Sequence, residues 1–130
     1  IAFQIQDDIL DICGDPANTG KPVGLDIKNG EQTLLVIHAL NHSRDPEKEY
    51  LKAIMSRERN PGIFDLDRVR RILVDTGSID YALQLSEGFV SKARTCIAGL
   101  EDSEAKQKLQ FIADFSVERI NNHVSNAFQV

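Results

Sequence analysis

Apolar residues recur every three or four positions along most of this chain, which is the spacing expected of α-helices that bury one face. The pattern covers 1–13 and is clearest over 78–100, where Ser78 precedes the apolar stripe as a candidate N-cap. A further stripe begins after Ser103, again a candidate N-cap, and ends near Val124. These three segments predict the longest helices of the fold.

Two shorter helices are predicted between the long ones. Residues 46–57 carry a helical stripe, with Asp45 as a candidate N-cap and Pro46 at the first helical position. A second short stripe covers 66–75 and is followed by Gly77, a residue type that commonly ends helices. Beyond its first residue, neither segment contains a proline, which would interrupt the backbone hydrogen bonds of a helix.

Two segments lack a clear amphipathic pattern. Residues 33–40 are almost wholly apolar and fit either a buried strand or a buried helix, but no partner strand can be recognised, so the helix is favoured. Residues 14–30 contain four of the eight glycines and two of the four prolines, which predicts one long loop or two. The predicted fold class is therefore all-α, a helical bundle of about six helices.

The composition fits one domain of ordinary size. Of the 130 residues, 42% are hydrophobic and 27% charged, which excludes collagen-like and disordered chains. A formal net charge of -5 disfavours a nucleic-acid partner, because such binders usually carry a basic surface. Cys13 and Cys96 form no CxxC pair, so reduced thiols in a cytoplasmic protein are expected. No apolar run approaches the roughly 20 residues of a transmembrane segment.

The polar side of the first predicted helix is the most informative feature. At about 100° per residue, Gln4, Asp7, Asp8 and Asp11 fall within one sector of a helical wheel, next to a stripe of isoleucines. One interpretation is an acidic face open to solvent. That interpretation is the weaker one, because a solvated face should be flanked by further charged residues. Carboxylates clustered beside apolar residues instead favour a bound cation.

The type of ligand narrows the choice of cation. Oxygen-only ligands favour a hard ion, and few protein ligands with room for water and phosphate favour Mg²⁺ over Ca²⁺.

The following loop adds Lys21, between Gly20 and Pro22. The Walker phosphate-binding pattern does not fit there, because Pro22 replaces its serine or threonine and a helix precedes instead of a strand. Lys21 is either a solvated lysine or a diphosphate contact, and the nearby carboxylates favour the contact.

The segments FQIQDDILD (3–11), GD (14–15) and TGKPVGLDI (19–27) resemble the second aspartate-rich motif and following loop of the trans-isoprenyl diphosphate synthases, the polyprenyl synthetase family. Residues 77–120 resemble the last two helices of that family. The resemblance implies a helical bundle of the isoprenoid synthase type. It also implies that residues 1–130 are the C-terminal part of a single domain, whose upstream part carries the first aspartate-rich motif.

The resemblance implies a reaction as well. Family members use Mg²⁺ to ionise an allylic diphosphate and add the carbocation to isopentenyl diphosphate, which gives a longer farnesyl, geranylgeranyl or polyprenyl diphosphate. Carried over position by position, it assigns Asp7 as the principal Mg²⁺ ligand, supported by Asp8 and Asp11 directly or through water. It assigns Asp26 to holding metal-bound water. Homodimers are common in the family, so a homodimer is expected.

The resemblance also assigns residues to the substrates. Lys21 matches the lysine that contacts the allylic diphosphate, and with Asp7 and Asp8 it forms the expected catalytic set. Phe3 and Gln4 match residues that line the substrate cavity near the metal.

The sequence departs from the family pattern at two points. Many members have a lysine after the glycine that ends the loop, whereas Gly30 is followed here by Glu31, and Lys28 is the candidate to supply the missing phosphate contact. The first DDxxD motif and the basic residues that bind isopentenyl diphosphate are absent. The chain opens at Ile1, inside an apolar stripe, so a longer polypeptide is expected and residues 1–130 are expected to be inactive alone.

Two other functions stay open at this stage. A non-catalytic subunit that modulates an active prenyl synthase would also resemble the family, although its aspartate motifs are usually eroded. A class I terpene cyclase shares the fold class, although its second metal motif usually contains Asn, Ser and Glu.

His38 and His42 have the i, i+4 spacing of a zinc site but lack the glutamate of an HExxH motif. The arginines between 57 and 71 are interpreted as a solvated helix surface.

Overall fold

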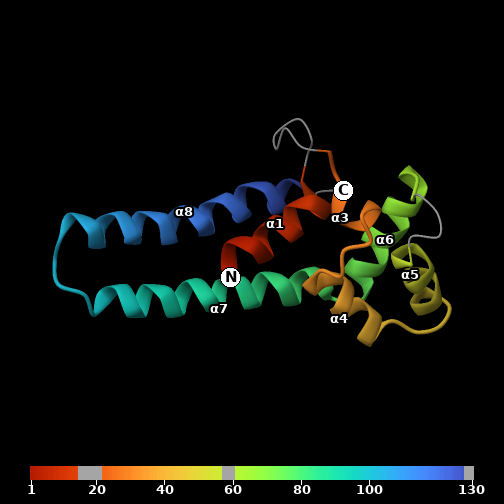
Figure 1. Ribbon diagram of the computed structural model, residues 1–130, viewed down its shortest axis with the longest axis horizontal. Helices are drawn as coiled ribbons and strands as arrows, with labels where there is room; N and C mark the ends of the chain where they lie inside the picture. Colours follow the sequence, from red (N-terminus) through yellow and green to blue (C-terminus); the bar gives the residue numbers. More distant parts are fainter. Residues whose placement is uncertain (15–21, 57–60, 128–130) are drawn as a thin grey trace.

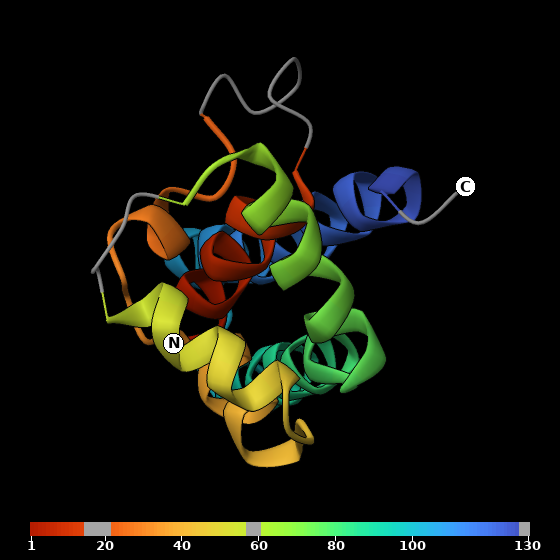
Figure 2. The same cartoon turned by 90° about the vertical axis from the view of Figure 1, so that its right-hand side faces the viewer.

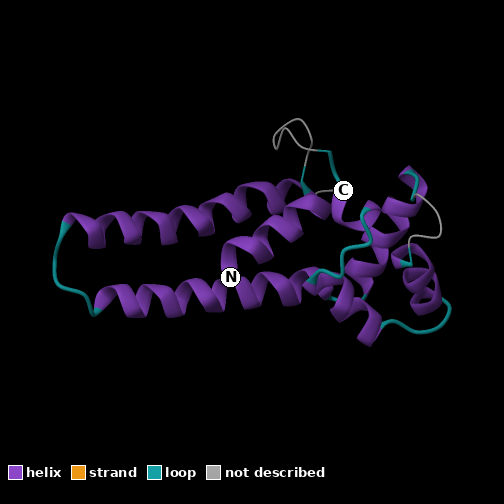
Figure 3. Cartoon of the chain, viewed as in Figure 1, coloured by secondary structure: helices purple, strands orange, loops and turns teal. Residues whose placement is uncertain are grey.

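The computed structural model describes residues 1–14, 22–56 and 61–127, without the side chains of 117–119 and 121–127. Within these ranges the chain forms seven helices and no strand, which confirms the predicted all-α fold class with one helix more than the six expected (Figure 1, Figure 3). The helices are α1 (Ala2–Cys13), α3 (Leu25–Lys28), α4 (Leu34–His42), α5 (Glu47–Met55), α6 (Ile63–Asp75), α7 (Ser78–Ala98) and α8 (Glu104–Ala127). None of these described helices is long and apolar enough to cross a membrane.

The helices α7 and α8 form a long hairpin, and α1 packs against both of them (Figure 1). The short helices α3, α4, α5 and α6 gather at the end of the molecule where α7 begins, and Figure 2 shows this group from that end. Because α1 also contacts α3 and α4, it is the central helix of the described fold.

Apolar side chains from every described helix form one core. Ile5, Ile9 and Ile12 of α1 are buried in it, together with Leu35 of α4 and Leu73 of α6. Full burial of such a side chain is worth about 1.5–3 kcal/mol relative to exposure. The isoleucine stripe therefore fixes which side of α1 faces the core and leaves the carboxylates on the other side.

Two helices start elsewhere than predicted. The helix α6 begins at Ile63, before the predicted start at Leu66. The sequence did not indicate this first turn, because Ile63 and Phe64 are exposed and do not belong to the apolar stripe. The N-cap of α7 is Gly77 in a left-handed conformation. Ser78, which was predicted as that cap, is instead buried in the first turn, where its hydroxyl group bonds to other side chains.

Three further details complete the comparison. Pro46 takes the N-cap position of α5 that was predicted for Asp45. The Ser103 cap is confirmed, since its Oγ accepts a hydrogen bond from the Lys106 backbone N–H at 3.2 Å. The helix α3 was not predicted, because it has only four residues and lies in the segment 14–30 that was expected to be loop.

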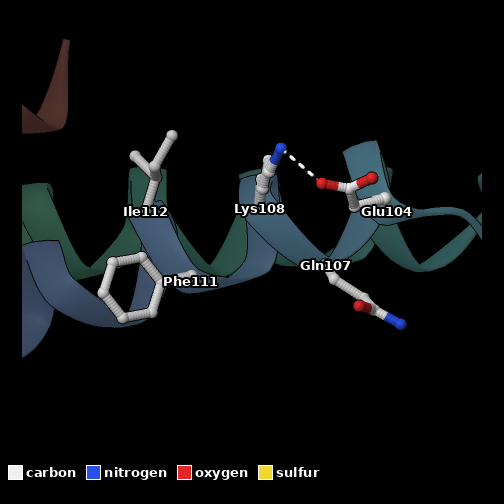
Figure 4. A pocket seen from close by; sticks show the side chains of 5 residues that line it. All are labelled: Glu104, Gln107, Lys108, Phe111 and Ile112. Carbon is white, nitrogen blue, oxygen red and sulfur yellow. Dashed lines mark ion pairs between the residues drawn. The ribbon is translucent and has the colours of Figure 1, made fainter.

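An apolar groove of about 460 Å³ lies on α8 near its turn with α7. Phe111 and Ile112 project from the helix there, and Lys108 forms an ion pair with Glu104 at 2.6 Å (Figure 4). All the residues that line this groove come from one helix, so no polar groups from different elements converge on it. It therefore lacks the features of a catalytic site.

Gly24 makes the turn into α3, and we expect its replacement to destabilise the fold. Its φ is 76°, and an added Cβ would lie 2.6 Å from Leu66 Cδ2. Left-handed strain and overpacking together should lower the free energy of unfolding of Gly24→Ala by about 2–4 kcal/mol.

Gly77→Ala is the matched control, because Gly77 has a φ of 64° but nothing lies within 4 Å of its added Cβ. The free energy of unfolding of this variant should fall only by the cost of the left-handed conformation, about 1–2 kcal/mol. Urea unfolding of both variants measures the difference, and equal losses would show that contact with Leu66 contributes nothing.

Candidate metal site

The carboxylates of α1 lie where the sequence predicts them, on one side of the helix. Asp7, Asp8 and Asp11 are half-buried, and Ile5 and Ile9 on the other side are buried. The acidic side chains therefore lie at the edge of the core and not on a fully solvated surface. This placement favours the cation site over the solvated face. We call Asp7, Asp8 and Asp11 the carboxylate face of α1.

Phe3 and Gln4 lie one turn earlier on the same helix, and both are exposed. The Gln4 Nε2 group donates a hydrogen bond to Asp8 Oδ1 at 3.0 Å, so this amide contacts the carboxylate face. Phe3 is 51% exposed, so much of its aromatic surface is open to solvent beside that face. Their contacts with a substrate remain a prediction.

Asp11 holds the short helix α3 against α1. Its Oδ1 accepts a hydrogen bond from the Leu25 backbone N–H at 3.0 Å, and its Oδ2 accepts one from the Asp26 N–H at 3.1 Å. The Gly24 N–H donates to the backbone oxygen of Asp11 at 2.7 Å. The carboxylate thus satisfies backbone donors at the start of α3 that have no partner within that helix. As a result, Asp26 is brought to the carboxylate face.

Negative charge accumulates around these residues. Burial raises the pKa of Asp8 and of Asp11, and neighbouring carboxylates raise both further. Burial, followed by the charges of Asp11, Glu31, Asp8 and Asp7, raises the pKa of Asp26 to about 6. These five carboxylates therefore repel one another when ionised. A cation among their oxygens would stabilise the ionised forms.

The ligand atoms available at this site suit a hard divalent cation. All of them are carboxylate oxygens, which Mg²⁺ prefers. In the part of the chain that the structure describes, no three His, Cys, Asp or Glu side chains surround one metal position. Mg²⁺ is usually held by one or two protein carboxylates, with water and substrate phosphates as its other ligands. The residues present fit Mg²⁺ on this basis.

Of the two lysines predicted for this site, the structure describes Lys28 but not Lys21. Lys28 is exposed at the end of α3, and its charge lowers the pKa of Asp11 by less than the charge of Glu31 raises it. The Glu31 backbone N–H donates to the Asp26 oxygen at 2.8 Å, which keeps Glu31 near the carboxylates. Lys21, predicted to contact the diphosphate, lies outside the described residues.

Two contacts that position α1 were not predicted. Gln6 is buried on α1, where its Nε2 group donates to Ser86 Oγ of α7 at 3.1 Å. Arg70 of α6 donates two hydrogen bonds to the Ile12 oxygen, from Nε at 3.0 Å and Nη2 at 2.8 Å. Placing all the arginines on a solvated surface was thus wrong for Arg70, which sits favourably at the C-terminal end of α1. Local sequence carries no signal for either contact, because the partners lie far along the chain.

The raised pKa of Asp26 predicts a pH-dependent stability in metal-free protein. A carboxyl group whose pKa is raised from 3.8 to about 6 binds a proton more tightly in the folded chain. Its contribution to stability is therefore complete below about pH 4 and is lost as the pH rises through about 6. We expect the free energy of unfolding of the natural protein to fall over this range relative to that of Asp26→Asn.

Urea unfolding in chelator at several pH values measures this difference. Saturating Mg²⁺ should reduce it, because a bound cation favours the ionised carboxylates. Parallel pH profiles for the two proteins in chelator would contradict the proposed placement of Asp26.

Comparison with known proteins gives a consistent set of relatives. A family model described as polyprenyl synthetase matches residues 1–72. Geranylfarnesyl diphosphate synthase of Aeropyrum pernix is 39% identical over 122 residues, which is 92% of this chain and 37% of that protein. Short chain isoprenyl diphosphate synthase of Methanothermobacter thermautotrophicus is 35% identical over 119 residues, which is 92% of this chain and 36% of that protein.

Solved structures agree with these relatives. Polyprenyl synthase from Caulobacter crescentus CB15, complexed with calcium and isoprenyl diphosphate, matches 89% of this chain with a TM-score of 0.77 and 32% identity. Geranylgeranyl pyrophosphate synthetase from Pyrococcus horikoshii matches 90% with a TM-score of 0.75 and 36% identity. In each case the match covers 35% of the other chain. The chain therefore spans little more than a third of the length of the proteins that it matches.

Proposed function

Because this chain belongs to the polyprenyl synthetase family, we propose that the full-length protein containing it is a Mg²⁺-dependent prenyltransferase. It joins isopentenyl diphosphate to an allylic diphosphate and releases a longer isoprenyl diphosphate and inorganic diphosphate. In this proposal residues 1–130 are the C-terminal part of one helical domain. The isopentenyl diphosphate site and the first aspartate-rich motif belong to other residues of the full-length protein.

The observation that carries this proposal is the group of five carboxylates around α1 and α3. Burial is the largest cause of the raised pKa values of Asp8, Asp11 and Asp26. The charge of Glu31 raises all three pKa values further, and the aspartates of α1 add to the rise for Asp8 and Asp26. A fold gains nothing in stability from such repulsion. The arrangement is explained if it serves to bind a divalent cation together with the diphosphate of a substrate.

The residues of this chain divide the work between metal and substrate. Asp7 and Asp8 hold the cation, and Asp11 supports it while it fixes α3, so that Asp26 can position a water molecule next to the cation. Mg²⁺, when bound, neutralises the negative charge that grows on the departing diphosphate. Lys21 binds the same diphosphate and adds a positive charge.

The remaining residues act on the substrate directly. Lys28 offers a second cation at the edge of the site, whereas family members often carry a lysine three positions further on, after the glycine that ends the loop. Phe3 and Gln4 line the cavity beside the allylic chain. The apolar surroundings exclude water, which would otherwise capture the carbocation.

Incubating the full-length protein with isopentenyl diphosphate and a mixture of allylic diphosphates tests this function. Mass spectrometry of the products should reveal a longer isoprenyl diphosphate in the presence of Mg²⁺ and none in its absence. The product also gives the chain length and the preferred allylic substrate.

A folded protein that binds allylic diphosphate without forming product would contradict the proposal. That outcome would favour a non-catalytic subunit, whereas a cyclic hydrocarbon product would favour a terpene cyclase. The same sample can be examined by light scattering, for which a homodimer is the expectation, and fractionation of cells should place the protein in the cytoplasm.

A further inference from the structure

Two buried polar side chains, Gln6 of α1 and Ser86 of α7, are hydrogen-bonded to each other inside the core. Both residues are 1% exposed, and the Gln6 Nε2 group donates to Ser86 Oγ at 3.1 Å. The Ser86 hydroxyl group in turn donates to the backbone oxygen of Ala2 at 3.5 Å. In an α-helix this oxygen also accepts the backbone N–H of the residue four positions later, which is Gln6. These contacts therefore form a closed ring of hydrogen bonds that joins α1 to α7.

Stability alone does not explain an amide at this position. Gln6 Oε1 is buried, and it accepts no hydrogen bond from the residues that the structure describes. Burying an amide oxygen without a partner is unfavourable. Replacing both members of a buried hydrogen-bonded pair by apolar groups of similar shape is often neutral or stabilising. A leucine at position 6 and an alanine at position 86 would therefore fill the core at least as well.

A buried hydrogen bond supplies a geometric definition that apolar contacts lack. Apolar burial is non-directional, so the isoleucine stripe of α1 sets which side of the helix is buried but tolerates small rotations. A hydrogen bond weakens steeply when its distance or angle departs from the preferred values. A single buried polar residue fixes the register of some coiled coils in this way. The bond between Gln6 and Ser86 therefore defines both the rotation of α1 and its position along α7.

The carboxylate face of α1 lies between two such polar attachments. Asp7 and Asp8 follow Gln6 directly, so a rotation or shift of the helix at Gln6 moves both carboxylates. At the other end of α1, Arg70 donates two hydrogen bonds to the Ile12 oxygen. The three aspartates of the face all lie between residues 6 and 12. Both ends of the segment that carries them are thus fixed to neighbouring helices.

We propose that Gln6 is a positioning residue, whose hydrogen bond with Ser86 holds the carboxylate face in the orientation that binds the catalytic cation. This inference rests on the proposed function, because it names what keeps that metal site in place. Gln6 is buried in the core and acts through Asp7 and Asp8, without touching the cation itself. A displacement of about 1 Å, caused by a change far from the reacting atoms, can lower the rate of an enzyme by about 10²-fold.

The test uses the full-length protein with both partners replaced, Gln6→Leu together with Ser86→Ala. This double variant leaves no unpaired amide in the core, so its free energy of unfolding in urea should equal or exceed that of the natural protein. Its affinity for Mn²⁺ in the presence of a non-hydrolysable allylic diphosphate analogue, measured by electron paramagnetic resonance, should nevertheless fall about 10- to 100-fold. Its kcat should fall by a similar factor. A merely structural role would not separate these losses from stability.

Ser116→Ala is the matched control. Ser116 is also a buried serine of the hairpin, but its hydroxyl group donates to the Ile112 oxygen within its own helix at 2.9 Å. Its replacement should leave the Mn²⁺ affinity and kcat within about twofold.

Natural Mn²⁺ affinity in the double variant would overturn the proposal, and so would an equal loss in Ser116→Ala. Metal binding needs no turnover, so the affinity tests the positioning role even if the natural protein forms no product, a result that would contradict the proposed function alone. A natural protein that binds no Mn²⁺ beside the analogue would overturn both.

Discussion

Replacing Asp7 with asparagine in the full-length protein should lower kcat by about 10²- to 10³-fold or more. The substitution keeps the shape of the side chain and removes the charge that, in the proposed function, holds the cation. The fold should survive, because Asp7 is only half-buried and lies outside the isoleucine stripe of α1. Steady-state kinetics at saturating Mg²⁺, with circular dichroism on the same sample, measures both effects.

Glu101→Gln is the matched control for this prediction. Glu101 is an exposed carboxylate in the turn between α7 and α8, at the far end of the hairpin from the short helices. Its neutralisation should leave kcat within about twofold, since Glu101 belongs neither to the carboxylate face nor to α3. Near-normal turnover in Asp7→Asn would show that the carboxylate face does not hold the catalytic cation.

Replacing Ile9 with alanine should have the largest effect on stability. Ile9 is 0% exposed and lies in the core on the side of α1 away from the carboxylates. Removing its buried methyl and methylene groups leaves a cavity, and such changes cost about 2–5 kcal/mol of unfolding free energy. That is a large fraction of the total for a domain of marginal stability. Urea unfolding at constant pH and Mg²⁺ measures the loss.

The same substitution at Ile63 provides the comparison, since Ile63 is 77% exposed at the start of α6. Its change to alanine should alter the unfolding free energy by no more than about 0.5 kcal/mol. Similar losses at the two positions would contradict the assignment of the buried face of α1. Together with Asp7→Asn, these two substitutions distinguish the residues that pack α1 into the core from the residues of its carboxylate face.

The sequence predicts the fold class and the carboxylate face because both depend on local spacing. A helical period places Asp7, Asp8 and Asp11 together whatever lies around them, and the isoleucines between them show which side is buried. The helices α5, α6, α7 and α8 were found in the same way, whereas α4 was favoured over a strand only because no partner strand could be recognised. The start of α6 was missed, because Ile63 and Phe64 are apolar but exposed and therefore do not follow the helical period of the buried residues.

What the sequence does not predict depends on contacts between distant segments. The helix α3 exists because the Asp11 carboxylate, 14 and 15 residues away along the chain, accepts the N–H groups of Leu25 and Asp26. The hydrogen bond between His38 and Ser78 spans 40 residues, so local sequence carries no signal for it. The contact of Lys21 with diphosphate, which depends on the loop outside the described residues, remains a prediction from the family motif.

The most direct test of the carboxylate site is to locate a metal ion in a crystal. Crystals of the full-length protein, grown with Mn²⁺ and a non-hydrolysable allylic diphosphate analogue, would give an anomalous signal at each manganese ion, which accepts the same oxygen ligands as Mg²⁺. The proposal predicts a manganese peak within bonding distance of Asp7, with analogue phosphate oxygens also bound to it. A bound analogue with no manganese at the carboxylate face of α1 would contradict it.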